Sequence, residues 1–85
     1  MPYIKAVERP QINEAIKNLK QYVNTKGQLN YAITCLCIEF LKSKSINYDN
    51  ISDIVTSLEC AKLEFYRRKA SIYEDEKIKI NGDVF

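Results

Sequence analysis

The chain has 85 residues, of which 46% are hydrophobic, and it carries a formal net charge of +2. This charge is too small to indicate nucleic acid as a partner, and the longest apolar run, residues 32–38, is far shorter than the roughly 20 residues that span a bilayer. Neither nucleic acid nor a membrane is therefore an expected partner. A chain of this length is expected to form a single domain, residues 1–85, with a small core.

The cysteines indicate the compartment and exclude a metal site. There are three of them and no histidine, and an odd number without a signal peptide is typical of the reducing cytoplasm. Cys35 and Cys37 are two residues apart in a helical pattern, so their side chains point to nearly opposite sides and cannot share a metal. We expect no metal and no cofactor. A domain this small often needs help to be stable, and oligomerisation is the remaining source of it.

The N-terminal part predicts a short extended arm, residues 1–9, followed by a helix over residues 10–26. Pro10 suits the first turn of a helix, where its missing N–H costs nothing. Lys26 and Gly27 then supply a helix stop, a cation followed by a residue that tolerates the left-handed conformation. One apolar stripe recurs at spacings of three and four residues, formed by Ile12, Ala15, Ile16, Leu19, Tyr22 and Val23.

The second predicted helix covers residues 30–44 and begins at Asn30, a good N-cap. Its apolar residues lie on nearly the whole circumference, which is typical of a helix surrounded by other elements. The other two helices of so short a chain can cover only part of it. We therefore expect Tyr31 and Ile38 to lie at an oligomer interface.

The third predicted helix covers residues 50–73, with Asn50 and Asp53 resembling a capping box at its start. Its length of about 35 Å exceeds that of the other helices by roughly two turns. The overhang carries Ile72 and Tyr73, and the C-terminal arm, residues 77–85, ends in Val84 and Phe85. With few glycines and prolines, the expected fold is all-α, a three-helix bundle made of a helical hairpin and a long C-terminal helix, with short extended arms.

A basic cluster with aromatic residues lies on the third helix, formed by Lys62, Tyr66, Arg67 and Arg68, with Tyr73 one turn further on. Such a set can bind a phosphate group or stack on a base. The alternative is ordinary pairing on a helix surface, because Glu64 precedes Arg67 by three residues. Two charges also lie on apolar faces, Glu39 and Lys62. They reach water, form a partly buried ion pair with each other, or take part in binding a ligand.

The sequence contains no recognisable catalytic apparatus. It has no histidine, and no serine or cysteine stands beside an expected base. The acidic run, residues 74–76, is consecutive along a helix, so its carboxylates do not converge on one cation. We expect no catalytic residue and no enzymatic activity.

Several segments resemble a family of small uncharacterised proteins from bacteria and their phages. The similarity is carried by MPYI at residues 1–4, LNYAIT at 29–34, LECAKLEFYRR at 58–68, YED at 73–75 and NGDVF at 81–85. It extends over nearly the whole chain. The resemblance implies a prokaryotic or phage setting, and it brings no activity and no functional residue.

Two functions follow as hypotheses. The first is a cytoplasmic protein-interaction module that forms a homo-oligomer, most simply a dimer, and binds another protein. In a phage setting such a partner includes a host system that the module inhibits. The second is a protein that binds a nucleotide or another phosphate-bearing small molecule through the basic cluster.

Overall fold

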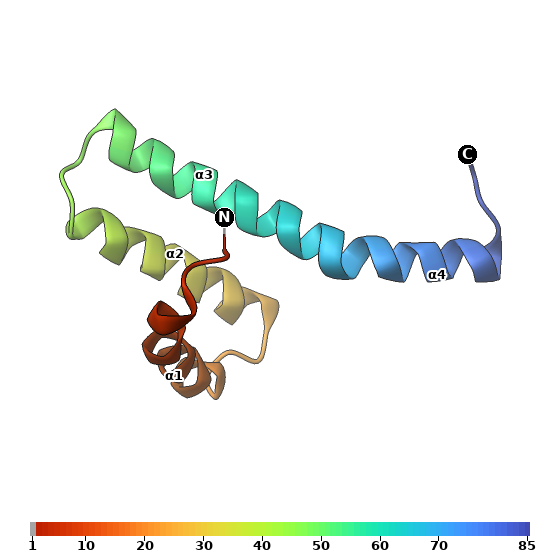
Figure 1. Cartoon of the computed structure of the whole chain (residues 1–85), viewed down its shortest axis with the longest axis horizontal. Helices are drawn as coiled ribbons and strands as arrows, with labels where there is room; N and C mark the ends of the chain where they lie inside the picture. Colours follow the sequence, from red (N-terminus) through yellow and green to blue (C-terminus); the bar gives the residue numbers. More distant parts are fainter. Residues whose placement is uncertain (1) are drawn as a thin grey trace. The chain divides into compact units, whose positions relative to one another are not determined.

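A computed structural model describes residues 2–85, and every regular element among them is helical (Figure 1). The elements are the 3-10 helix η1 (Ala6–Glu8), α1 (Arg9–Lys20), α2 (Lys26–Lys42), α3 (Tyr48–Phe65), the π turn η2 (Tyr66–Ala70) and α4 (Ser71–Asn81). Because α3, the π turn and α4 follow one another without a gap, the described chain has three helical segments. The all-α class and the order of the three helices are confirmed.

The chain divides into two compact units. The N-terminal unit is Tyr3–Ile54, and the C-terminal unit is Val55–Phe85 together with Pro2. The expectation of one domain over residues 1–85 stays a prediction.

The first helix begins where the sequence indicates, with a proline in its first turn. α1 starts at Arg9 and carries Pro10, whose missing N–H would have no partner inside the helix. The arm before it has no regular secondary structure over residues 2–5 and then forms η1, while Met1 lies outside the described residues. The Arg9 guanidinium donates two hydrogen bonds to the carbonyl oxygen of Ile4, at 3.1 and 2.8 Å. These bonds hold the arm against the start of α1.

The second helix begins four residues earlier than predicted, and the expected N-cap Asn30 lies inside it. Thr25 has an extended backbone, and its hydroxyl accepts the N–H of Gln28 at 3.1 Å. The Gln28 side chain accepts the N–H of Thr25 in return, also at 3.1 Å. This reciprocal capping box satisfies two free N–H groups. Lys26 and Gly27, predicted as the stop of the first helix, are therefore the first turn of the second.

The third helix also begins earlier, so the predicted capping box at Asn50 is wrong. The Asn47 side chain accepts the N–H of Asn50 at 2.9 Å, as an N-cap residue does. The side chain of Asn50 donates instead to the carbonyl oxygen of Ser45 at 2.7 Å. The cap is thus three residues upstream of the predicted one.

The C-terminal unit is a single helical run that reaches further than predicted (Figure 1). It continues through the π turn and α4 to Asn81, so most of the expected arm over residues 77–85 is helical. The helix ends at Gly82, whose φ of 89° is accessible to glycine. Of the expected arm, residues 82–85 are non-helical.

Within residues 2–85 no side chain is fully buried. The best-covered residues are half-buried, and they include Val23, Ala32, Leu41, Ile54 and all three cysteines. The other large apolar side chains of the described residues are more exposed than these, from 38% at Ile4 upward. Neither unit therefore contains a closed core of its own.

Candidate functional site

The basic cluster coincides with an irregularity of the helix. Tyr66, Arg67 and Arg68 lie in the π turn, and Lys62 lies one turn before it in α3. The N–H of Ser71 donates to the carbonyl oxygen of Tyr66, five residues earlier. Such a bond accommodates one extra residue in the turn, and π turns of this kind are frequent at functional sites.

The π turn brings Tyr66 and Glu74 onto the same side of the helix. The Tyr66 hydroxyl donates to a Glu74 carboxylate oxygen at 2.7 Å. Residues eight apart in a regular α-helix differ by about 80° in direction, whereas residues seven apart nearly align. The inserted residue makes an eight-residue separation behave like seven. The hydrogen bond to the Glu74 carboxylate, with its charge, raises the pKa of Tyr66 above its ordinary value of 10.0.

The acidic residues of this helix already engage much of the cluster. Arg67 donates to Glu64 at 2.7 Å, and the Glu64 side chain is only 21% exposed. Lys62 lies 3.7 Å from Glu59. Arg68 and Lys69 make no ion pair with any described residue. The cluster therefore shows ordinary ion pairing on a helix surface. Arg68 and the adjacent Lys69 are the two cations here that can bind an anion.

Glu39 and Lys62 each have a neighbour of opposite charge on their own helix. Glu39 lies 3.5 Å from Lys42, and both side chains are 70% exposed. Lys62 pairs with Glu59 in the same exposed manner. These contacts span three residues and are typical of solvated helix surfaces. An ion pair between Glu39 and Lys62 stays a prediction.

The acidic run on α4 has partners within its own unit. Glu74 accepts the Tyr66 hydroxyl, and Glu76 lies 3.6 Å from Lys79. The Lys77 ammonium lies 5.5 Å from the centre of the Tyr73 ring. In residues 2–85 no group of three or more potential ligands is arranged to hold a metal ion.

The predicted interface residues are all exposed in the single chain. They are Tyr31, Ile38, Ile72, Tyr73, Val84 and Phe85. The π turn changes the directions of Ile72 and Tyr73 relative to α3, because one extra residue rotates the helix that follows by about 100°. Tyr73 then continues the apolar stripe of α3, and Ile72 lies to one side of it. Their role in assembly stays a prediction.

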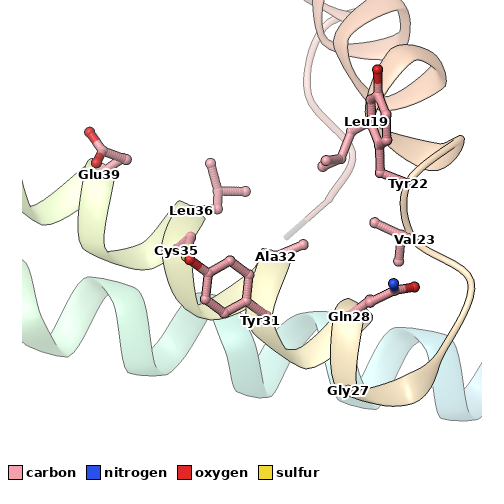
Figure 2. A pocket seen from close by; sticks show the side chains of 10 residues that line it. All are labelled: Leu19, Tyr22, Val23, Gly27, Gln28, Tyr31, Ala32, Cys35, Leu36 and Glu39. Atoms are coloured by element: carbon pink, nitrogen blue, oxygen red, sulfur yellow. The ribbon is translucent and has the colours of Figure 1, made fainter.

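The N-terminal unit holds two adjoining apolar grooves between α1 and α2. We name them the tyrosine-side groove, of about 590 Å³, and the lysine-side groove, of about 690 Å³. They share walls formed by Leu19, Val23, Ala32 and Leu36. Figure 2 shows the tyrosine-side groove, with Ala32 and Leu36 on α2, Leu19 near the end of α1 and Val23 on the loop that follows α1.

Different polar groups line the two grooves. Tyr31 and Glu39 line the tyrosine-side groove, whereas Lys20 and Lys26 line the lysine-side groove. The neighbouring Cys35 side chain raises the pKa of the Tyr31 phenol above 10.0. An open apolar surface with a few charged groups at its margin is suited to binding apolar side chains of a partner.

Sequence reasoning found Tyr31 in this region and missed the shared walls of the grooves. The apolar circumference of α2 was a usable signal for Ala32 and Leu36, because both lie on it. Leu19 and Val23 lie on the apolar stripe of the first helix, but this stripe did not indicate that they would face α2. That arrangement depends on the N-cap of α2 at Thr25, and the Thr25-x-x-Gln28 spacing could have indicated this cap.

The fold and these sites define a small all-α protein whose apolar helix surfaces lie open in the single chain. It belongs to a family described as a domain of unknown function, DUF6899, whose model matches residues 1–84. Neither the curated proteins nor the solved structures gave a match to this chain. Among the described residues, no helix is both long and apolar enough to cross a membrane.

Proposed function

We propose that this chain is a protein-interaction module that assembles as a homo-oligomer, most simply a dimer, and binds another protein. One observation carries the proposal. Almost half of the residues are hydrophobic, yet none of the described residues is buried within the chain. Burial of apolar surface is the dominant favourable term in folding and association, so a second protein surface is the natural cover.

The second helix needs this cover most. Leu36 and Tyr31 are both 71% exposed, and they point away from the helix axis in different directions. Each large side chain of this kind gains about 1.5–3 kcal/mol when it is fully buried. A partner that covers both directions therefore adds substantially to the stability of a domain this small.

The proposed setting is the cytoplasm of a bacterial cell, including one infected by a phage. Three unpaired cysteines are suited to a reducing compartment. The exposed tyrosines are suited to a protein interface, since they are large, stiff and polar at one end.

The mass of the purified full chain tests this proposal. Light scattering after size exclusion, followed by native mass spectrometry, should give twice the 9.9 kDa chain mass or a higher multiple. A monomer that persists at about 100 µM, where even a weak specific dimer would assemble, would overturn the homo-oligomer.

A second candidate function is binding of a phosphate-bearing ligand at the π turn. It is favoured by the coincidence of the irregular turn with Arg67 and Arg68. A nucleotide panel in a thermal-shift assay tests it. Replacing both arginines with alanine should remove a ligand-induced shift without unfolding the chain. Absence of any shift with the unmodified chain would count against this function.

A further inference from the structure

The last four residues form an ordered hook, which we define as residues 82–85. Gly82 redirects the chain at the end of α4 with a φ of 89°. The Asp83 carboxylate then accepts the N–H of Phe85 at 2.8 Å. Val84 and Phe85 are 92% and 113% exposed, more than any other large apolar residue described. Two apolar side chains are thus presented to the surroundings on a short, internally bonded segment.

The grooves of the N-terminal unit offer an apolar site of suitable size. Each has several hundred Å³ of open volume, enough for a phenylalanine and a valine side chain. The common walls Leu19, Val23 and Leu36 provide carbon surface on both sides. Transfer of the hook's side chains onto this surface would remove apolar area from water on both partners.

Charge distinguishes the two grooves. The one charged side chain of the hook is Asp83. Glu39 lines the tyrosine-side groove, where it would repel Asp83. Lys20 and Lys26 line the lysine-side groove, and neither takes part in the ion pairs formed among residues 2–85. Lys26 also lies in the first turn of α2, where the helix dipole is already positive, so an acidic partner is favoured there.

We propose that the hook of one copy binds in the lysine-side groove of a second copy, with Val84 and Phe85 against the apolar walls and Asp83 beside Lys20 and Lys26. This inference rests on the proposed homo-oligomer and names the contact that forms it. In a twofold dimer the exchange is reciprocal, so each assembly holds two hooks and two filled grooves. The hydrogen bond from Phe85 to Asp83 reduces the conformational entropy lost on binding.

Matched valine variants test the apolar part of the contact. Val84→Ser should raise the dimer dissociation constant about tenfold, since it removes apolar area from the interface. Val7→Ser is the control, because Val7 is 83% exposed and lies in η1, outside both grooves. Sedimentation equilibrium measures both. Equal dissociation constants for the two variants and the unmodified dimer would overturn the proposal that the hook forms the dimer contact.

Charge variants test which groove is occupied. Asp83→Asn keeps an acceptor for the Phe85 N–H and removes the charge, so the dissociation constant should rise by a few fold. Asp83→Lys should weaken the dimer further, and combining it with Lys20→Glu and Lys26→Glu should restore part of the affinity. If the hook lay in the tyrosine-side groove instead, Asp83→Lys would tighten the dimer by attraction to Glu39, and so would Glu39→Lys with Asp83 unchanged. Either result would show that this assignment is wrong.

Photocrosslinking tests that the groove belongs to a second copy. A benzoylphenylalanine at position 85, in a mixture of isotopically light and heavy chains, should give mixed light–heavy crosslinks to peptides with Leu29 or Ile33. Crosslinks confined to one isotope, or to peptides outside residues 16–36, which contain the lining of the groove, would overturn the inference. A dimer that persists without these crosslinks retains the proposed homo-oligomer and rejects the hook, whereas a monomeric unmodified chain rejects both.

Discussion

The helices α2 and α4 differ in where their stabilising interactions come from. α2 has a complete capping box at its start and one exposed ion pair near its end, and apolar side chains occupy most of its length. α4 carries three consecutive acids followed by two lysines, and along its own surface Lys79 pairs with Glu76 and Lys77 lies over the Tyr73 ring. Its first turn is joined to the π turn by the Tyr66–Glu74 hydrogen bond.

The two helices illustrate two sources of stability. One is side-chain pairing within the helix itself, and the other is burial of apolar side chains against another surface. Side-chain pairs three or eight residues apart in the sequence stabilise a helix whatever surrounds it, but each pair contributes little free energy. Apolar side chains on all sides of a helix contribute more, and only when something covers them. α2 is thus expected to respond strongly to changes in assembly, and α4 only weakly to changes in its own pairs.

The largest expected effect is that of a charge on the shared wall of the two grooves. Leu36→Asp should weaken the dimer about 100-fold or more, because a carboxylate without a partner is costly to bury. Analytical ultracentrifugation measures the change. Ile46→Asp is the control, since Ile46 is equally apolar, 80% exposed and outside the grooves. Similar dimer dissociation constants for Leu36→Asp and Ile46→Asp would indicate that α2 is not part of the interface.

A smaller effect is expected at the start of the same helix. Thr25→Ala removes the hydroxyl that accepts the Gln28 N–H, and loss of an N-cap costs about 1 kcal/mol. Urea unfolding measures it. Thr56→Ala, in the middle of α3, should leave the stability unchanged or slightly higher, because alanine favours helix. A Thr25→Ala variant as stable as the Thr56→Ala control would contradict the observed cap.

At the π turn we expect a change in titration. The pKa of Tyr66 is raised by Glu74, so the contact favours the neutral phenol. Its contribution to stability is therefore present below pH 10 and is lost as the pH rises through the raised pKa. Glu74→Ala should return the pKa toward 10.0, as measured by phenolate absorbance with Tyr66→Phe as the reference. Glu76→Ala should leave this titration in place, and an equal shift in both variants would argue against the direct contact.

The smallest expected effect concerns Glu39. Its pair with Lys42 is exposed, so Glu39→Gln should lower the free energy of unfolding by only about 0.3 kcal/mol. Glu14→Gln on α1 is the matched control. A loss of about 1–3 kcal/mol at Glu39 alone would instead indicate the partly buried pair with Lys62. The same urea experiment therefore decides between the two partners.

The fold class and the order of helices could be predicted because they depend on periodicity and on few residues such as Pro10. The starts of the second and third helices were less accurate, since a second residue with a cap signal stands near each. Gly27 was interpreted as a stop although Thr25 and Gln28 had capping-box spacing, and Asn50 was predicted as the cap where Asn47 is the cap. In both places the residue that caps is the one whose side chain reaches the third N–H of the helix.

The candidate sites could be predicted only where they depend on residues that are close together in the sequence. The basic cluster was identified from its residues, and Arg67 with Glu64 forms the surface pair that was one of the two alternatives. The π turn had no signal, because an inserted residue leaves the composition of an amphipathic helix unchanged. The grooves arise from two helices meeting at residues 21–25, and helical periodicity does not describe how helices meet.

The π turn has a consequence for comparing members of the family. An alignment that counts residues along this helix should need a one-residue gap within positions 66–70 wherever a relative has a regular α-helix there. Without that gap, every position beyond it would be compared with a neighbour about 100° around the helix. Ile72 would then be matched to the position that Tyr73 occupies in space. Chains that differ by one residue at this point can therefore present the same surface.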